Sequence, residues 1–413
     1  MPIKRYLFEN LRTHLPKKEM SLIVGPRQAG KTTLMLQLRD YLEKKGEKTI
    51  FLSLDFERDL PYFMSQAMLL DRIRLELGNR KGYVFIDEIQ RKENAGLFLK
   101  GVYDMQTPYK FILSGSGSVE LKEKVHESLA GRKRMFELNT VSLKEFINFR
   151  TGYKYEDRLD KYFKVSKAEG MGLLMEYLNF GGYPRVVLED TLEEKSAIID
   201  EIYRSYIEKD IAYLLRVERI DAFGNLIRLL AGQTGNMINF NELSSTLGIS
   251  VQTVKHYVAY AEKTFIIKRV TPYFRNLRKE ISKSPVMYFN DLGMRNFAVR
   301  HFGRYTMLSE LGFVFQNLVC HLLSEKTRVD GGTIHYWRTK DKAEVDFVIS
   351  RGDNIVPVEV KCREMRDKEI GRSLRGFIGR YNPAEAWVVN ISLKAEELIE
   401  KTRIRFIPIF ELL

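Results

Sequence analysis

Cysteine is scarce in this chain. Its 413 residues include two cysteines, Cys320 and Cys362. Two thiols are too few for a disulfide framework or for a metal site made of thiolates, so the composition excludes a small disulfide-stabilised secreted domain. The scarcity of cysteine favours a reducing cytoplasmic compartment.

Long apolar runs are also absent. No stretch approaches the ~20 apolar residues that an α-helix needs to cross a bilayer. The first residues, MPIKRYLFENLRTHLPKKEM, lack the apolar core of a signal peptide. The sequence therefore predicts no membrane span.

What the chain does contain is charge and enough length for several domains. Its 413 residues are 44% hydrophobic and 29% charged, the composition of a folded soluble protein. A chain of this length is expected to divide into about two to four domains. The formal net charge of +13 suits a polyanionic partner such as nucleic acid, although a basic surface without such a partner fits equally well.

The segment SLIVGPRQAGKTTLMLQL at 21–38 has the features of a phosphate-binding loop. An apolar strand leads into the spacing GxxxxGK[ST], and an amphipathic helix follows. The glycines let backbone N–H groups turn toward phosphate oxygens, and the helix directs its positive end to the same place. Lys31 is predicted to reach the β- and γ-phosphates of ATP, and Thr32 is predicted to hold Mg²⁺. The predicted nucleotide-binding residues of this loop are Gly25, Pro26, Arg27, Gln28, Ala29, Gly30, Lys31, Thr32 and Thr33.

A later apolar strand supplies two carboxylates. GYVFIDEIQ at 82–90 ends in Asp87 and Glu88, which is the pattern of a Walker B strand. Asp87 would hold the magnesium ion through water, and Glu88 would polarise the water that attacks the γ-phosphate. The alternative is an acidic strand end that only caps the next helix.

The strand KFILSGS at 110–116 also ends in polar residues. If it lies between the strands that lead to Lys31 and Asp87, Ser114 lies between Asp87 and the γ-phosphate and acts as a sensor. This arrangement, with Glu88 directly after the Walker B aspartate, resembles AAA+ and related ATPases. GTPases generally lack this glutamate, so ATP is the predicted nucleotide.

Two further segments offer arginines to the nucleotide. HESLAGRKR at 126–134 contains Arg132, which could stabilise transition-state charge, most simply in a neighbouring subunit. LNFGGYPRVV at 178–187 contains a turn that similar lids place near the adenine, with Pro184 and with Arg185 as a γ-phosphate sensor. The alternatives are a solvated basic loop and an ordinary helix-capping turn.

The middle of the chain predicts helices and then a winged helix. Apolar spacing is helical through a lid and linker at 139–215. The segment 239–270 reads as helix, tight turn, helix and the start of a β-hairpin, with Ser250 as the cap of the second helix. A winged helix can bind DNA, or it can pack only against other domains. The candidate DNA contacts are Gln252, Thr253, Lys255, Lys268, Arg269 and Arg275.

AEVDFVISRGDNIVPVEVK at 343–361 predicts two strands joined by a turn. Alternation along a strand would direct Asp346 and Val348 to one face. A hairpin can then gather Asp346, Glu359 and Lys361 at one place, where two carboxylates hold a divalent ion and the lysine orients a water. The spacing is similar to the PD-(D/E)xK nuclease pattern, and a partly buried ion pair is the alternative.

Taken together, the chain resembles a group of prokaryotic AAA+ P-loop ATPases with a winged helix and a C-terminal PD-(D/E)xK nuclease-like domain of unknown function. The motifs that carry the resemblance occur in order: GPRQAGKTTLM, FIDEIQ, LSGSGS, ESLAGR, GGYPR and EVDF…VPVEVK. It implies an α/β multidomain protein, a DNA-associated ATPase that works with ATP and Mg²⁺, in some relatives as a ring. The expected domains are an AAA+ core at 1–138, a lid at 139–215, a winged helix at 216–283 and a restriction-endonuclease-like domain at 284–413.

One departure from the nuclease pattern bears on activity. Nucleases of this fold usually take a further acidic ligand from the preceding helix, here 309–325, where this chain has Gln316. An amide is a poorer ligand for a hard cation than a carboxylate. The favoured interpretation is therefore an ATP-driven switch or motor that binds DNA, with an ATP-regulated nuclease and a nucleotide-dependent assembly protein without nucleic acid as alternatives.

Overall fold

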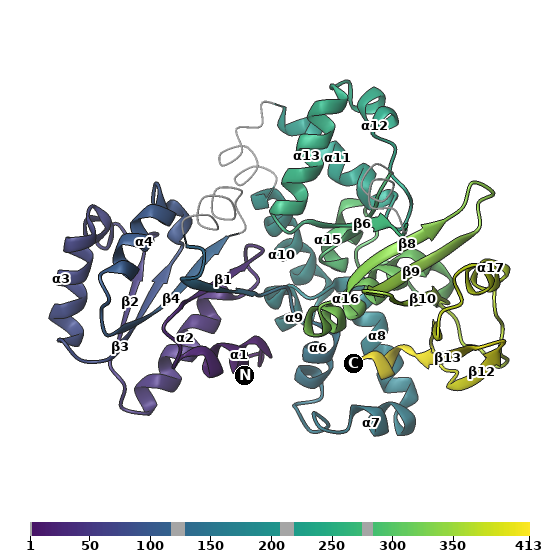
Figure 1. Ribbon diagram of the computed structural model, residues 1–413, viewed down its shortest axis with the longest axis horizontal. Helices are drawn as coiled ribbons and strands as arrows, with labels where there is room; N and C mark the ends of the chain where they lie inside the picture. Colours follow the sequence, from purple (N-terminus) through teal and green to yellow (C-terminus); the bar gives the residue numbers. More distant parts are fainter. Residues whose placement is uncertain (1, 117–128, 207–218, 275–283) are drawn as a thin grey trace.

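The structure is a computed structural model that describes residues 2–116, 129–206, 219–274 and 284–413. These residues form two lobes (Figure 1). The left lobe contains a five-stranded sheet, and the right lobe contains an eight-stranded sheet surrounded by helices.

The sheet of the left lobe is parallel throughout, with the order β2-β3-β4-β1-β5. Strand β4 lies between β1 and β3, as the sequence predicts. Its apolar residues are buried on both faces, which is typical of a central strand in a parallel sheet. All carboxyl ends therefore meet at one edge of the sheet. The strands are β1 (Met20–Gly25), β2 (Thr49–Ser53), β3 (Gly82–Asp87), β4 (Tyr109–Ser116) and β5 (Lys133–Glu137).

Helices cover both faces of this sheet. Leu34 and Leu38 of α2 pack with Leu11 of α1 on one face, and Ile73 of α3 and Leu99 of α4 pack on the other. The result is a three-layer α/β lobe. Its helices are α1 (Leu7–His14), α2 (Lys31–Lys44), α3 (Gln66–Leu77) and α4 (Ala95–Asp104).

The right lobe begins with helices, as the apolar spacing predicts. They are α6 (Leu143–Arg150), α7 (Leu159–Val165), α8 (Lys167–Phe180), α9 (Pro184–Leu188) and α10 (Leu192–Arg204). A second set follows: α11 (Ile220–Gly232), α12 (Phe240–Leu247) and α13 (Val251–Lys263). Gly248 makes the left-handed turn between α12 and α13, and the Ser250 hydroxyl caps α13 by accepting from the Thr253 N–H.

An antiparallel hairpin then leads into the C-terminal sheet. The hairpin consists of β6 (Ile267–Pro272) and β7 (Val286–Phe289), so α11–α13 and this hairpin have the element order of a winged helix. The remaining elements are α15 (Leu292–Ala298), α16 (Gly312–Asp330), β8 (Thr333–Arg338), β9 (Glu344–Arg351), β10 (Asn354–Val360), α17 (Arg372–Tyr381), β11 (Glu385–Asn390), β12 (Ala395–Ile399) and β13 (Thr402–Pro408).

The hairpin does not belong to a separate domain. The predicted boundary between 283 and 284 falls between β6 and β7, which pair with each other. Strand β6 also pairs in parallel with β8, so the eight-stranded sheet runs β12-β13-β11-β10-β9-β8-β6-β7. Apolar residues of the hairpin enter the same core as the C-terminal strands, which explains why this boundary is wrong.

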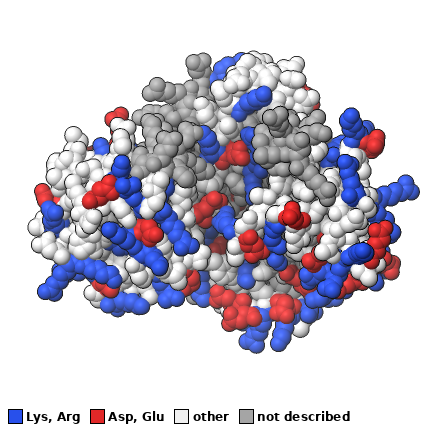
Figure 2. All heavy atoms as spheres, in the orientation of Figure 1, with Lys and Arg blue, Asp and Glu red and all other residues white. Residues whose placement is uncertain are grey.

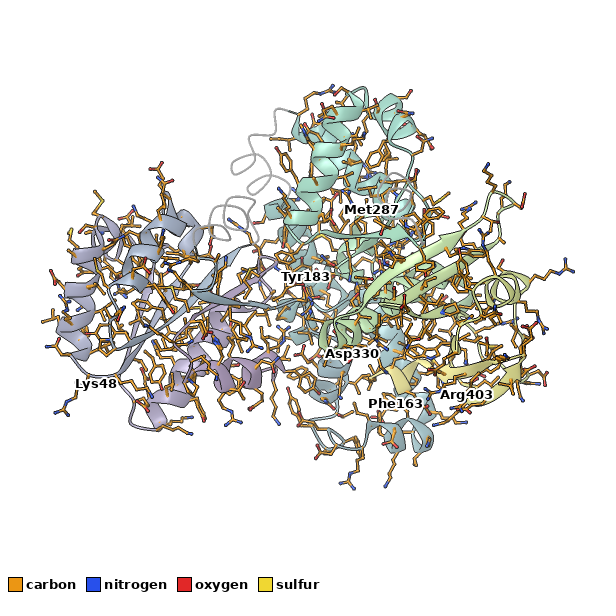
Figure 3. All side chains as sticks on the ribbon, in the orientation of Figure 1. Lys48, Phe163, Tyr183, Met287, Asp330 and Arg403 are labelled. Atoms are coloured by element: carbon orange, nitrogen blue, oxygen red, sulfur yellow. The ribbon has the colours of Figure 1, made fainter. Side chains whose placement is uncertain are left out.

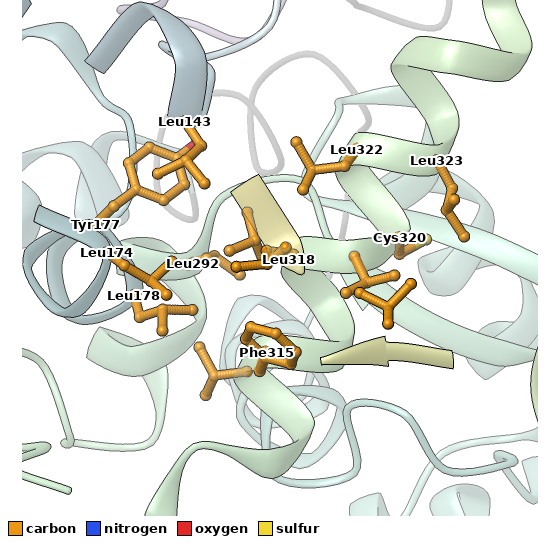
Figure 4. Close-up of a cluster of buried hydrophobic side chains, with 14 of the residues drawn as sticks. Leu143, Leu174, Tyr177, Leu178, Leu292, Phe315, Leu318, Cys320, Leu322 and Leu323 are labelled. Carbon is orange, nitrogen blue, oxygen red and sulfur yellow. The ribbon is translucent and has the colours of Figure 1, made fainter. Parts of the chain in front are cut away.

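The lid shares that core as well. Figure 4 shows Leu174 and Tyr177 of α8 beside Leu318 of α16, all in one buried cluster. At the far end of the lobe, Phe163 of α7 stacks on Phe410 near the C-terminus, with ring centroids 3.8 Å apart (Figure 3). The predicted lid, hairpin and nuclease-like region are therefore one packed body.

Buried Asn317 of α16 should be important for the stability of this body. Its side chain accepts from the Phe289 N–H at 2.9 Å and donates to the Phe289 carbonyl at 2.8 Å, completing the edge strand β7. Asn317→Leu should lower the free energy of unfolding by about 1–2 kcal/mol, because the buried Phe289 N–H loses its partner, whereas the Phe289 carbonyl keeps its contact with His321 Nε2 at 2.6 Å. Urea unfolding would measure this. The exposed control Asn79→Leu should unfold like the wild type, and equal stability of all three proteins would contradict the prediction.

Candidate nucleotide-binding site

The phosphate-binding loop lies at the carboxyl edge of the five-stranded sheet, between the end of β1 and the start of α2. Gly25 has φ 159°, and a Cβ atom there would lie 2.0 Å from the Leu138 carbonyl oxygen, so only glycine fits. Gly30 has φ 93° and begins α2 in the left-handed region. The backbone N–H groups at the start of α2 are thus directed into the loop.

Lys31 lies inside this loop. Its Nζ atom donates to the carbonyl oxygens of Gly25 at 3.1 Å and Pro26 at 2.8 Å, and the side chain is buried. An ammonium group held at the centre of a loop of backbone N–H groups can exchange these carbonyls for phosphate oxygens. This is the placement that the motif predicts.

A chain of hydrogen bonds joins the loop to the two neighbouring strands. The Thr32 hydroxyl donates to Asp87 Oδ2 at 2.7 Å, and the Ser114 hydroxyl donates to Asp87 Oδ1. The backbone N–H of Glu88 donates to the same Ser114 oxygen at 3.2 Å. The structure therefore brings together the predicted magnesium pair, the predicted sensor and the predicted water-polarising glutamate.

Glu88 has an uncommon backbone conformation. Its φ of 56° lies in the left-handed region, which a non-glycine residue occupies only when its surroundings hold it there. Its carboxylate lines the cleft beside the loop and accepts a hydrogen bond from the Gln90 side chain. The Gln90 amide thus fixes the carboxylate at the edge where a γ-phosphate would lie.

A cleft of about 510 Å³ lies beside these groups, and residues of the second lobe form one wall of it. Pro184 and Arg185 line it, and Arg185 donates to Gln28 at 3.1 Å and to Glu201 of α10 at 2.8 Å. The predicted residues that line the cleft are Arg27, Gln28, Gly30, Lys31, Thr32, Thr33, Glu88, Pro184 and Arg185. Gly25, Pro26 and Ala29 belong to the loop but do not line the cleft.

Three contacts to this site have no counterpart in the motifs. Arg5 lines the cleft, donates to the Ala29 carbonyl at 2.8 Å and pairs with Glu145 of α6 at 3.1 Å. The Tyr206 hydroxyl accepts from the Arg27 backbone N–H at 2.8 Å. Asp55 lines the cleft just after β2. Of these three residues, only Asp55 could have been predicted from the sequence, because it follows a strand whose carboxyl end lies at this edge.

Arg132 does not reach the nucleotide site of its own chain. Its carbonyl accepts from Met20 at the start of β1, and its side chain pairs with Asp104 at 2.8 Å. Strand β5 runs parallel to β1, so the residue before β5 lies at the amino edge, opposite the loop. A role for Arg132 in a neighbouring subunit remains a prediction.

The candidate DNA contacts are only partly available. Gln252 and Lys255 are exposed on α13, whereas Thr253 bonds the Ser250 hydroxyl within the helix cap. Lys268 donates to Ser324 of α16 at 2.5 Å, and Arg269 pairs with Glu262 of α13 at 3.2 Å. Lys268 is thus directed toward α16, whereas Arg269 is exposed, and contact of either residue with DNA stays a prediction. Arg275 lies outside the described residues.

The C-terminal carboxylates are not arranged as alternation predicts. Between the pairs His335–Val348 and Trp337–Val345, β9 contains one residue more than β8, which is a β-bulge. Val345 and Val348 therefore pack in the same core cluster. At the bulge, the Asp346 carboxylate accepts from the Gln316 amide at 2.8 Å and from the Val360 N–H at 2.7 Å.

Burial raises the pKa of the Asp346 carboxyl group to about 7, against the lowering effect of the Val360 N–H, and nearby Glu359 raises it further. Glu359 itself pairs with Lys361 at 2.6 Å and accepts from the Gly371 N–H at 3.3 Å. Each member of the predicted metal trio is thus already bonded within the protein. Among the described residues, no three His, Cys, Asp or Glu side chains are grouped so that they could hold a metal ion.

Comparison with known families agrees with this architecture. Residues 17–147 match an AAA domain, residues 171–304 match a domain of unknown function (DUF8612), and residues 311–412 match a second domain of unknown function (DUF4143). The AAA match supports the P-loop ATPase core that the motif order predicts. It ends near the first residues of the second lobe.

Relatives cover most of the chain. An uncharacterized protein of Methanocaldococcus jannaschii is 26% identical over 368 residues, which span 88% of this chain and 78% of the relative. One of Mycobacterium tuberculosis is 26% identical over 377 residues, 89% of this chain and 75% of the relative. Among solved structures, the replication initiator DnaA bound to AMPPCP and single-stranded DNA overlaps with 63% of this chain and 88% of its own, at 15% identity and a TM-score of 0.28.

No helix in the described ranges has both the length and the apolar character needed to cross a bilayer.

The half-buried Asp346 gives the free energy of unfolding a specific pH dependence. Its pKa is near 3.9 in an unfolded chain and about 7 here, so the folded state holds the proton more tightly. The resulting stabilisation is complete below about pH 4 and is lost as pH rises through 7. Relative to Asp346→Asn, the wild type should therefore lose up to about 4 kcal/mol over this range.

Urea unfolding of both proteins at several pH values measures this difference. The control Asp353→Asn changes an exposed carboxylate in the β9–β10 turn and should follow the wild type at every pH. Parallel curves for the wild type and Asp346→Asn would show that the Asp346 carboxyl group is not perturbed.

Proposed function

We propose that this chain binds ATP with Mg²⁺ in the cleft around Lys31, hydrolyses it, and uses the cycle as a switch that acts on DNA. The observation that carries the proposal is the hydrogen-bonded chain Thr32–Asp87–Ser114 directly beside the loop. A hydroxyl and a carboxylate at this distance form a half-site for a hard divalent cation.

Each residue of the cleft would have its own role in phosphoryl transfer. Thr32 and Asp87 hold the magnesium ion, which neutralises charge on the phosphate oxygens. Lys31 exchanges its two carbonyl partners for β- and γ-phosphate oxygens, and the N–H groups of the loop bind the remaining oxygens. Glu88 leaves the Gln90 amide and orients the attacking water, while Ser114 keeps Asp87 in place.

The second lobe would respond because it supplies one wall of the cleft. Arg185 bridges Gln28 of the loop and Glu201 of α10, and Tyr206 accepts from Arg27 of the loop. A γ-phosphate near Arg185 competes with Glu201 for the same guanidinium group. Binding and release of that phosphate would then change how α10 is held against the left lobe.

DNA as the target is supported by charge and by α13. The net charge is +13, and Gln252, Lys255 and His256 are exposed along the second helix of the helix–turn–helix. Figure 2 shows basic and acidic side chains interspersed over the visible face of the molecule. Contacts through lysine and arginine to phosphates would be salt-sensitive and largely independent of sequence.

A second candidate function is a nucleotide-dependent assembly protein without nucleic acid. It is favoured by the packing of the hairpin within the protein: β6 pairs with β8, and Lys268 donates a hydrogen bond to Ser324. The nuclease alternative gains no such support, because Gln316 and Val360 already occupy both oxygens of Asp346.

Two substitutions separate nucleotide binding from hydrolysis. Lys31→Ala should abolish both, because the loop loses its one buried cation. Glu88→Gln should keep nucleotide affinity within a few-fold and lower ATP turnover by about 10²-fold or more. Titration with a fluorescent ATP analogue and a phosphate-release assay measure the two steps. Lys44→Ala, at the far end of the same helix, is the matched control, and turnover by Glu88→Gln at the wild-type rate would overturn its role.

DNA should raise ATP turnover at low salt, and the stimulation should disappear when salt is raised, because counterion release then no longer favours binding. Phosphate release with single-stranded, duplex and branched DNA at increasing salt measures this. ATP turnover that no DNA form changes, together with undetectable DNA binding, would favour the assembly function instead.

A further inference from the structure

Two adjoining hollows lie on the second lobe, away from the nucleotide cleft. Their volumes are about 410 Å³ and 470 Å³, and both are lined by Arg228, Ala298 and Arg300. They therefore form one elongated cleft between α10, α11 and the segment after α15, which we call the arginine cleft. These elements pack against one another in the upper middle of Figure 1.

Four exposed arginines line the arginine cleft: Arg219, Arg228, Arg300 and Arg304. Arg219 donates to the Gly248 carbonyl at 3.2 Å. Within the described part of the chain, the guanidinium groups of the other three make no hydrogen bond or ion pair. Of the described residues that line the cleft, Asp221 is the single acid. Some arginines elsewhere, such as Arg150 and Arg185, are instead paired with carboxylates.

The floor of the smaller hollow, which Tyr203, Phe297 and Phe302 line, is aromatic. The rings of Tyr203 and Phe297 lie 5.4 Å apart, and those of Phe297 and Phe302 lie 6.3 Å apart, so the three form a row. The Tyr203 hydroxyl is buried and has no hydrogen-bond partner among the described residues. A buried donor without a partner costs free energy unless a ligand or water satisfies it.

Guanidinium groups beside aromatic side chains are the elements that bind a nucleic-acid strand. Arginine forms paired hydrogen bonds with phosphate oxygens, and aromatic rings offer surface to the bases. A recessed aromatic floor can meet bases only when they are unpaired, since a duplex keeps them stacked inside. The elongated shape, with arginines spread along both hollows, suits several successive phosphates better than one small anion.

We propose that the arginine cleft binds single-stranded DNA, an inference that rests on the proposed function in taking DNA as the target. Helix α10 connects it to the nucleotide site. Ser196 and Tyr203 of α10 line the arginine cleft. On the opposite side of the same helix, Glu201 bonds Arg185 and Ser205 lines the nucleotide cleft. A shift of α10 during ATP turnover would therefore change the cleft that holds the strand.

The test is binding of a fluorescein-labelled oligothymidylate of about 20 nucleotides, longer than the site of a typical single-strand binder. The variant carries Arg228→Gln, Arg300→Gln and Arg304→Gln, which remove three charges and no internal contact. Fluorescence anisotropy should show affinity reduced by tenfold or more, on the order expected for three lost phosphate contacts. The slope of log affinity against log salt should fall by about 2.

Two controls make the result specific. Arg58→Gln, Arg74→Gln and Arg80→Gln remove the same charge from exposed positions on the left lobe, and Lys255→Gln removes a cation from α13. Both should bind the oligonucleotide like the wild type. The triple variants of the cleft and of the left lobe should also keep the wild-type unfolding midpoint and basal ATP turnover.

The outcomes distinguish this inference from the proposed function. If the triple variant of the cleft binds the single strand as tightly as the wild type does, the proposal for the arginine cleft is wrong, and the proposed DNA function is unaffected. Equal loss from the Lys255→Gln control places the strand on α13 and also overturns it. If the wild type binds no DNA, both the proposal for the arginine cleft and the DNA part of the proposed function are wrong. The phosphate-release assay then still tests the proposed ATP hydrolysis.

Discussion

The carboxylate of Asp87 is the point on which the nucleotide site depends. One of its oxygens accepts from Thr32 of α2 and the other from Ser114 of β4, so a single side chain at the end of β3 joins three neighbouring elements. These bonds fix the loop against the sheet before any nucleotide arrives. Preorganisation of this kind lets the binding energy of ATP act on the parts whose contacts would be exchanged, namely Glu88, Lys31 and the second lobe.

The second lobe is suited to move as a unit when ATP binds, because its elements pack as one body. Helices α6 to α8, the hairpin and the C-terminal sheet share one core, and α10 packs with α11–α13 and the same hairpin in a second core. A movement of α10 is therefore passed to the hairpin. The contacts across to the loop are few and polar: Arg185, Tyr206 and Arg5. A rigid body held by a few polar contacts is an arrangement in which one phosphate can change the balance between two positions.

The positions of residues that follow from local sequence patterns could be predicted, whereas positions that depend on tertiary packing could not. Lys31, Thr32, Asp87 and Ser114 could be placed because parallel strands bring their carboxyl ends to one edge. The position of Arg132 at the amino edge could not be read from its motif, because it depends on which end of β5 the chain enters, and its role in a neighbouring subunit stays a prediction. Arg5 carries no motif, since its contacts lie far away in the sequence. Asp346 was assigned to the wrong face because a single extra residue in β9 reverses the alternation, and no local pattern marks a bulge.

Helix α16 explains why the nuclease-like trio has become part of the scaffold. Its side chains reach three strands of the large sheet: Gln316 donates to Asp346 of β9, Asn317 bonds Phe289 of β7, and Ser324 accepts from Lys268 of β6. Near its end, Arg328 pairs with Glu137 of β5 in the left lobe at 3.1 Å.

One turn from Arg328, the exposed Glu325 lies near Glu145, the partner of Arg5. The helix thus runs from the surroundings of the phosphate-binding loop to the carboxylate that a nuclease would give to a metal. With glutamine at position 316, that carboxylate bonds to α16 instead. The C-terminal strands thus hold the helix through these side-chain bonds.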